Sequence, residues 1–185
     1  MNTGNLTLSI NLTLNHFMQD SAIDIYTVYT LDQMMQNYHL IVQLTPSLTI
    51  AMYQHYLQEM IPHRYAQIIA KKGDDIVGVS GFWIATKLYC GKYLEIDNLI
   101  VDAKHRSQQI GHLLVKQLEI IAKQNDCQVM MLDAYLSNTE AHRFYQQNDF
   151  KAKGYHFIKK TLTIPINHEC LRDEGSLTNL DEALK

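Results

Sequence analysis

Residues 99–114 constrain the fold more than any other part of the sequence. They read as an apolar strand, a polar turn that contains Arg106, and the start of a helix near Gly111. The apolar face of this helix recurs at helical spacing, at Ile110, Leu113, Leu114, Leu118 and Ile121. A buried strand that turns directly into an amphipathic helix is typical of a sheet covered by helices.

The rest of the chain supplies further strands and helices in a definite order. Short apolar or alternating runs predict strands at residues 23–29, 65–70, 76–89, 93–101 and 128–136, and a final strand or strand pair at 155–164. Capping and proline signals predict helices from Thr30 to about residue 42, from Ser47 to about Met60, and from Ser137 through Gln147. A β-helix-β-helix-β series after an antiparallel meander predicts an α/β fold, a mixed sheet with helices on both faces.

The net charge of −3 comes from the end of the chain. Residues 1–165 hold 14 basic and 14 acidic side chains, whereas residues 166–185 hold two basic and five acidic ones. We therefore expect an N-terminal extension (1–21), one domain (22–165) and an acidic tail (166–185). Alternating Leu and Thr in the extension suits an edge strand or an arm at a subunit contact.

The composition also argues against several classes of partner. A neutral body argues against a nucleic-acid partner, which needs a basic excess. No apolar run is long enough to cross a bilayer, and the first nineteen residues carry no Lys or Arg, so we expect a cytoplasmic protein without a membrane partner. Three widely spaced cysteines and nine histidines form no ligand motif, so we expect reduced thiols and no metal.

The turn and helix start at residues 106–111 are suited to binding an anion. The first N–H groups of a helix lack internal partners, and the helix dipole places partial positive charge there. Arg106 adds a full charge, and Gly111 would let a phosphate approach the backbone. Neither the P-loop pattern nor the dinucleotide-binding glycine pattern is present. An ordinary connection with a solvated arginine would have the same spacing.

Two blocks resemble the GNAT superfamily of N-acyltransferases. Val101-Asp-Ala-Lys-His-Arg-Ser-Gln-Gln-Ile-Gly-His-Leu-Leu114 is similar to its acyl-CoA signature [Q/R]-x-x-G-x-[G/A], with Gln109 in place of the first glycine and Ser107 where glycine is frequent. Asn138-Thr-Glu-Ala-His-Arg-Phe-Tyr-Gln-Gln-Asn-Asp-Phe150 is similar to N-x-x-A-x-x-[FL]-Y-x-x-x-G-F, with Asp149 in place of glycine. The resemblance covers roughly residues 22–164.

This resemblance implies transfer of an acetyl group from acetyl-CoA to a primary amine by direct attack in a ternary complex. The amine would be a small cationic amine or a peptide N-terminus. The implied cofactor contacts are Leu99, Ile100, Val101, Arg106, Ser107, Gln108, Gln109, Ile110, Gly111, His112, Asn138 and Tyr145. The Leu99 N–H is the implied oxyanion donor. Many members of the superfamily dimerise, so a homodimer is a further expectation.

The resemblance also assigns catalytic roles. Tyr145 would protonate the leaving thiolate, and Glu95 would act as the base. Glu95 and Asp97 share one face of a strand and could bind a cationic amine together with Asp133, an alternative base. Each residue also has a purely structural explanation: a packed tyrosine, or carboxylates on a solvated strand. Because Gln109 departs from the signature, a non-catalytic acyl-CoA-binding module, a sensor or an interaction partner, remains the alternative.

Overall fold

A five-stranded mixed sheet organises the protein, whose structure is a computed structural model that describes residues 22–159 and 161. Its strands are β1 (Ile23–Val28), β2 (Tyr65–Lys72), β3 (Asp75–Lys87), β4 (Gly91–Val101) and β5 (Val129–Leu132). They lie in sequence order; β1 to β4 pair antiparallel, and β5 runs parallel to β4. The predicted N-terminal strand or arm and the acidic tail lie outside the described residues.

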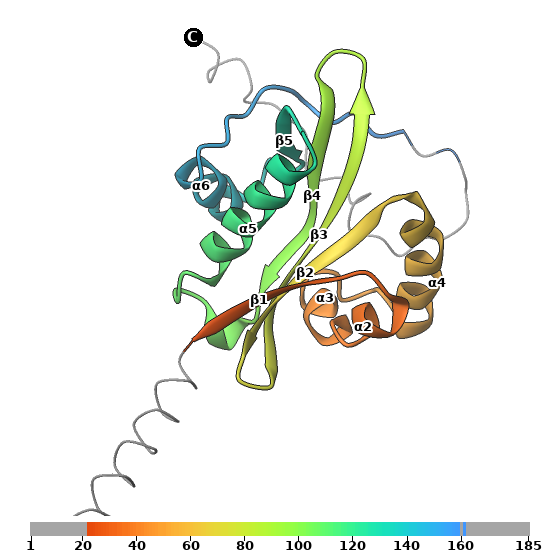
Figure 1. Cartoon of the computed structure of the whole chain (residues 1–185), viewed down its shortest axis with the longest axis vertical. Coiled ribbons are helices and arrows are strands. Elements are labelled where there is room, and N and C mark those ends of the chain that lie inside the picture. The colour runs from red at the N-terminus through yellow and green to blue at the C-terminus, as the bar shows by residue number, and fades with distance from the viewer. Residues whose placement is uncertain (1–21, 160, 162–185) are drawn as a thin grey trace, which may run out of the picture.

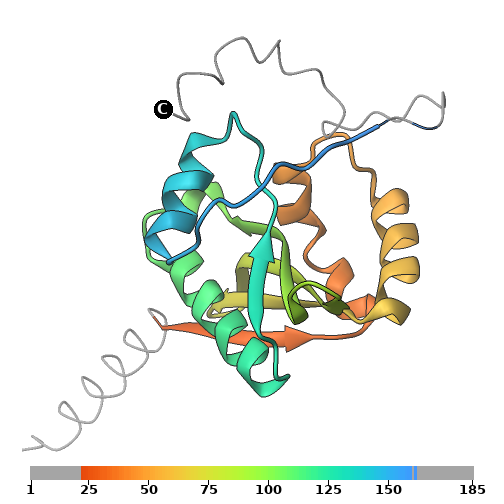
Figure 2. The same cartoon turned by 90° about the horizontal axis from the view of Figure 1, so that it is seen from above.

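Helices cover both faces of this sheet, as predicted (Figures 1 and 2). The helices are α2 (Leu31–Met35), α3 (Tyr38–Leu44), α4 (Ile50–Met60), α5 (Ile110–Gln124) and α6 (Thr139–Gln147). Two short 3₁₀ turns, η1 (Ile61–His63) and η2 (Ala103–His105), connect them to strands. Helices α2 to α4 lie against one face, and α5 lies against the other with α6 beside it. No helix of the described residues is long and apolar enough to cross a membrane.

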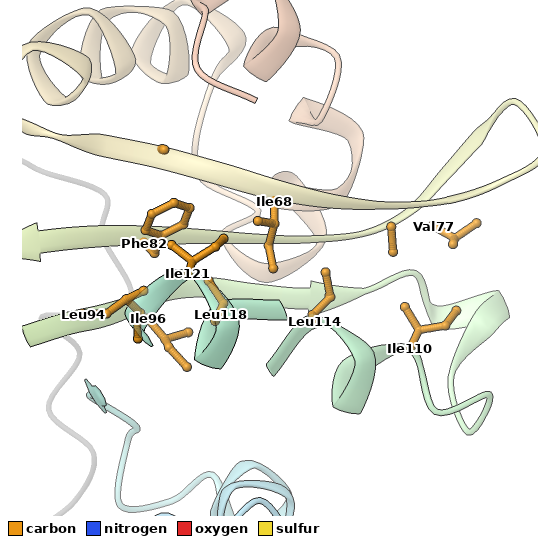
Figure 3. Close-up of a cluster of buried hydrophobic side chains, with 12 residues drawn as sticks. Ile68, Val77, Phe82, Leu94, Ile96, Ile110, Leu114, Leu118 and Ile121 are labelled. Atoms are coloured by element: carbon orange, nitrogen blue, oxygen red, sulfur yellow. The ribbon is translucent and has the colours of Figure 1, made fainter. Parts of the chain in front are cut away.

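The core on the α5 face follows the helical spacing of the sequence. Ile110, Leu114, Leu118 and Ile121 pack against strand side chains that include Ile68 and Leu94 (Figure 3). Leu113 departs from the prediction, because its side chain is exposed on the outside of α5. Burial of these aliphatic side chains fixes where α5 begins, and so fixes the turn that precedes it.

The helical layer on the opposite face is more broken than predicted. A capping box at Thr30 and Gln33 opens α2, as expected. The single helix predicted after it is wrong, because the chain leaves the helix after Met35 and restarts at Tyr38. Asn37 at this break is completely buried, and its Nδ2 donates to Gln67 Oε1 over 2.8 Å.

Helix α4 also begins later than predicted. Thr49, not Ser47, is its N-cap, because the Thr49 Oγ1 accepts the Met52 N–H over 3.2 Å. Similarly, Asn138 rather than Ser137 caps α6, and its side chain accepts the Ala141 N–H over 3.1 Å. In both places a side chain closer to the first helical turn takes the capping position.

Two strand predictions near the end of the domain are wrong in extent. The predicted buried strand at residues 128–136 is only β5, whose side chains are partly exposed. It pairs with β4 along one edge and, among the described residues, with no strand along the other. The final strand or strand pair predicted at residues 155–164 lies partly outside the described residues; its described part, residues 155–159 and 161, forms neither helix nor strand, and the side chains there are exposed. An alternating pattern needs a strand to pair with, and this segment finds none in the described chain.

Candidate active site

Strands β4 and β5 pair briefly and then separate. Their ladder runs from Tyr93 opposite Val129 to Ile96 opposite Leu132. Beyond that point β5 ends, whereas β4 continues to Val101. The β4 backbone beyond Ile96 therefore has an edge that β5 leaves unpaired, and an extended amide-bearing ligand can pair with such an edge.

A bulge interrupts β4 at this point. Gly81 of β3 faces Asp97, and Val79 faces Ile100, so three steps along β4 match two along β3. Asn98 lies in the bulge with φ of 53°, in the left-handed region that asparagine tolerates better than most residues. A bulge leaves a residue out of the regular ladder and redirects its backbone groups. The Leu99 N–H, the predicted oxyanion donor, belongs to this bulge.

Asp97 is a partly buried carboxylate at the edge of this bulge. Burial raises the pKa of Asp97; the Trp83 hydrogen bond opposes this rise, and the charge of Glu95 adds to it. The Trp83 Nε1 donates to Asp97 Oδ2 over 3.3 Å. Glu95 faces Trp83 across the β3–β4 ladder, so the two carboxylates and the indole share one face of the sheet.

Tyr145 on α6 approaches the same carboxylate. Burial raises the pKa of Tyr145 to about 12, and the negative charge of Asp97 adds to this rise. Its ring packs against Phe144 and Phe150, with centroids 5.2 and 5.7 Å away. The hydroxyl therefore keeps its proton at neutral pH and can donate it. The fold brings Glu95, Asp97 and Tyr145 together from β4 and α6.

The turn before α5 has the backbone of an anion site. Ser107 and Gln109 both have positive φ, 62° and 65°, at the positions where the resemblance predicts or often finds glycine. Gln109 is the N-cap of α5 and makes no side-chain cap, so it leaves the first N–H groups of the helix available. Arg106 and Gln108 are exposed, and within the described chain Arg106 has no carboxylate partner. These features fit a phosphate group.

Of the next three residues, Gly111 and His112 connect α5 to α6. The Ile110 side chain belongs to the core, so only its backbone faces the turn. A Cβ on Gly111 would lie 3.0 Å from the Phe144 ring, which gives this glycine a packing role beside the predicted phosphate role. The His112 Nδ1 lies 2.8 Å from Asn148 Oδ1, and its ring lies 5.2 Å from Phe144.

The remaining predicted residues lie around this centre. Leu99 and Val101 pack toward the α5 face, whereas Ile100 is buried on the opposite face. The Asn138 side chain is engaged in capping α6. Asp133 follows β5 and is largely exposed, and its Oδ2 lies 2.8 Å from His156 Nδ1. In the described part of the chain no cluster of His, Cys, Asp or Glu could hold a metal ion.

The sequence reasoning missed several residues of the site. The sequence predicts Trp83, the hydrogen-bond partner of Asp97, only as part of the strand at residues 76–89. Asn98 carried a usable signal, because asparagine is depleted in strand interiors and marks a bulge. Gln67 carried another, because an amide in the middle of a buried apolar strand must find a partner.

Known proteins resemble this chain in sequence and in fold. Residues 29–150 match the acetyltransferase (GNAT) family. Glucosamine 6-phosphate N-acetyltransferase of Candida albicans is 26% identical over 110 residues, 58% of this chain and 70% of that protein. Aminoalkylphosphonate N-acetyltransferase of Salmonella typhimurium is 27% identical over 92 residues, 49% of this chain and 60% of that protein.

Solved structures agree on the fold. A glucosamine-6-phosphate N-acetyltransferase from Arabidopsis thaliana superposes with a TM-score of 0.60 at 21% identity, over 75% of this chain and 98% of that one. An aminoglycoside acetyltransferase from an uncultured soil sample superposes with a TM-score of 0.67 at 17% identity, over 76% and 97%. The matched residues 29–150 hold the β4 bulge, the turn before α5 and Tyr145, and the chain accordingly belongs to the GNAT family of acetyltransferases and is an acyltransferase.

Proposed function

We propose that this protein transfers an acetyl group from acetyl-CoA to a primary amine by direct attack in a ternary complex. One observation carries the proposal. Asp97 on β4 and Tyr145 on α6 interact electrostatically where β4 and β5 separate. A proton acceptor and a proton donor from two elements thus lie near each other beyond the end of this ladder, as an acyl transfer to an amine requires.

Two parts of the chain suit the acyl-CoA substrate. Arg106 and the backbone from Ser107 to His112 would hold the pyrophosphate at the start of α5. The unpaired edge of β4 at residues 99–101 would pair with the amides of the pantetheine arm, and Asn138 would lie near it. In the bulge, the Leu99 N–H would stabilise the oxyanion that forms when the amine attacks the thioester carbonyl.

The acid and base roles follow from the protonation states. Asp97 or Glu95 accepts the proton that the amine must lose, directly or through water. The amine nitrogen forms a bond to the acetyl carbon, and the carbon–sulfur bond breaks. Tyr145 then donates its proton to the departing sulfur. Because the pKa of Asp97 is raised, its carboxylate is a stronger proton acceptor than that of an ordinary aspartate.

The acceptor surface suits a cationic amine. The Asp97 and Glu95 carboxylates supply negative charge, and the Trp83 ring beside them can lie against an ammonium group. Asp133 would extend this acidic surface at the end of β5. A small amine or a peptide N-terminus satisfies these requirements. Because two relatives are named for acetylating an aminosugar phosphate and an aminoalkylphosphonate, such small amines are the first to test.

A thiol-release assay with acetyl-CoA and a panel of amines tests the proposal. The panel should hold an aminosugar phosphate, an aminoalkylphosphonate, an aminoglycoside, a polyamine and a short peptide, and calorimetry should measure acetyl-CoA binding in parallel. We expect binding and amine-dependent release of thiol. Binding without turnover on any amine would favour a non-catalytic acyl-CoA module, and absence of binding would overturn both readings.

A further inference from the structure

A chain of buried polar side chains runs from the helical layer to the β4 bulge. Asn37, Tyr53, Tyr65 and Gln67 are each at most 5% exposed. The Asn37 Nδ2 donates to Gln67 Oε1 over 2.8 Å, and Gln67 Nε2 donates to the hydroxyls of Tyr53 and Tyr65, each over 3.1 Å. A buried polar network lowers stability unless its donors and acceptors are hydrogen-bonded. The presence of this network in the core therefore suggests a function.

The hydrogen bonds of this network have a defined order of donors and acceptors. Both hydrogens of the Gln67 amide are used, and its oxygen accepts from Asn37. The Tyr53 hydroxyl donates its own hydrogen bond to the Met34 carbonyl over 3.0 Å. The Tyr65 hydroxyl accepts from Gln67 and lies over Gly81, the register partner of Asp97 on β4.

The sheet leaves room for this hydroxyl beside the acceptor site. Gln67, Gly81 and Asp97 are register partners across β2, β3 and β4. A side chain on Gly81 would overlap the Tyr65 hydroxyl, so the glycine provides the space through which Tyr65 reaches from Gln67 toward Asp97. A hydrogen bond from the Asn98 side chain lowers the pKa of the same hydroxyl, against the rise caused by burial. Burial, with the charge of Asp97 added, raises the pKa of Tyr65 and keeps it a neutral phenol.

We propose that Tyr65, held by Gln67 and Asn37, is a positioning residue that fixes the β4 bulge and the Asp97 carboxylate. The break between α2 and α3 thereby acts on the acceptor site, because Asn37 at this break holds Gln67. This inference rests on the proposed acetyl transfer. Four groups face Asp97: Tyr65 from β2, Trp83 from β3, Glu95 from β4 and Tyr145 from α6.

The test compares Tyr65→Phe with a matched hydroxyl deletion, Tyr38→Phe. The Tyr38 hydroxyl donates to the Leu48 carbonyl over 2.9 Å, and its ring packs on Tyr53, but it makes no bond to Gln67. For Tyr65→Phe we expect kcat to fall at least about 10-fold, because a small misplacement of reacting groups is costly. The KM for acetyl-CoA should change less than kcat, because the turn before α5 that would hold the pyrophosphate is untouched. The acid limb of the pH–rate profile should move to higher pH, because the buried carboxylate loses a neighbouring O–H dipole. Tyr38→Phe should show none of this.

Amide hydrogen exchange supplies a readout that needs no activity. We expect the amides of residues 98–100 to exchange faster in Tyr65→Phe than in the wild type or Tyr38→Phe. Asn98→Gly is a second variant, since glycine keeps the positive φ and removes the side-chain bond to Tyr65. It should shift the pH profile in the same direction but by less, because the Tyr65 hydroxyl is kept but no longer held by Asn98. The kcat of Tyr65→Phe/Asn98→Gly should be no lower than that of the less active single variant.

The outcomes separate the two proposals. A wild-type protein that acetylates no amine overturns the proposed function and leaves the exchange comparison as the test of the network. An active wild type whose Tyr65→Phe and Asn98→Gly variants match Tyr38→Phe in kcat, pH profile and exchange overturns the positioning role. If Tyr65→Phe does not fold, Asn98→Gly decides by the same readouts.

Discussion

Among single residues, Asp97 shows most clearly how a requirement of function can lower stability. Burial raises its pKa, which means that the folded protein disfavours the carboxylate relative to the unfolded chain. Such a group stabilises the fold while it is protonated, and this contribution is lost as the pH rises through its folded-state pKa. An active site that needs an ionised carboxylate to receive a proton at neutral pH therefore lacks this contribution to stability.

Asp97→Asn should therefore be more stable than the wild type at neutral pH. The asparagine keeps the acceptor oxygen for Trp83 and removes the buried charge. The advantage should shrink as the pH falls below the ordinary aspartate range near 4, where both folded and unfolded wild type are protonated. Urea denaturation at neutral and acid pH measures this, and a variant less stable than the wild type at neutral pH would refute it.

The pH–rate profile separates the two candidate bases. If Asp97 accepts the amine proton, Asp97→Asn should lose the acid limb of kcat/KM and about 10²-fold or more of the rate. Glu95→Gln should keep the limb, moved to lower pH because the charge that helps raise the Asp97 pKa is gone. The reverse pattern would assign the base to Glu95, and a profile unchanged in Glu95→Gln would remove that residue from the mechanism.

Gln109 has a backbone conformation that suits glycine better. Its φ of 65° costs an ordinary L-residue roughly 1–2 kcal/mol, part of which glycine gives back as entropy lost on folding. Gln109→Gly should therefore raise the free energy of unfolding by about 0.5–1 kcal/mol. Gln108→Gly is the matched control, since its φ is not positive and no gain is expected. Equal effects in the two variants would show that Gln109 is not strained.

At the scale of elements, the contact between α5 and α6 connects the anion site to Tyr145. Gly111 in the first turn of α5 meets the Phe144 ring, and Phe144 precedes Tyr145 on α6. His112 and Asn148 add a hydrogen bond between the same two elements. The position of the proton donor thus depends on a helix-to-helix contact as well as on its own side chain.

Gly111→Ala tests this dependence. The added methyl group would lie 3.0 Å from the Phe144 ring and should push α6 away from α5. We expect kcat to fall about 10-fold, since the proton donor moves with α6. The free energy of unfolding should change by less than about 1 kcal/mol, because the gain in helix propensity offsets overpacking. Phe144→Leu added to Gly111→Ala should restore kcat. If kcat of this double variant does not recover, Gly111 acts through contact with the ligand alone and not through α6.

The elements also show what sequence patterns can predict. The strands of the meander, the start of α5 and the capping box at Thr30 follow from local patterns, and all three are confirmed. The break at Asn37 could not be predicted, because Gln67, the hydrogen-bond partner of its buried side chain, lies thirty residues away. The extent of β5 depended on whether a strand lies on its other side, which no local pattern contains.

At the scale of the whole molecule, the candidate site forms where the two halves of the domain meet. The first half supplies the acidic face of β4 and the polar chain behind it, and the second supplies α5, β5 and α6. The motifs predicted Tyr145, Glu95 and the turn at Arg106 because these residues recur in the family pattern. They could not predict Trp83, Tyr65 or Gln67, whose roles depend on neighbours across the sheet.

The turnover of Tyr145→Phe tests the central claim most directly. The substitution removes one hydroxyl and keeps the ring packing with Phe144 and Phe150. With acetyl-CoA and the best amine of the panel, we predict a loss of about 10²-fold or more in kcat, with acetyl-CoA binding unchanged by calorimetry. Full turnover in Tyr145→Phe would contradict the account, because the leaving thiolate would then obtain its proton without this tyrosine.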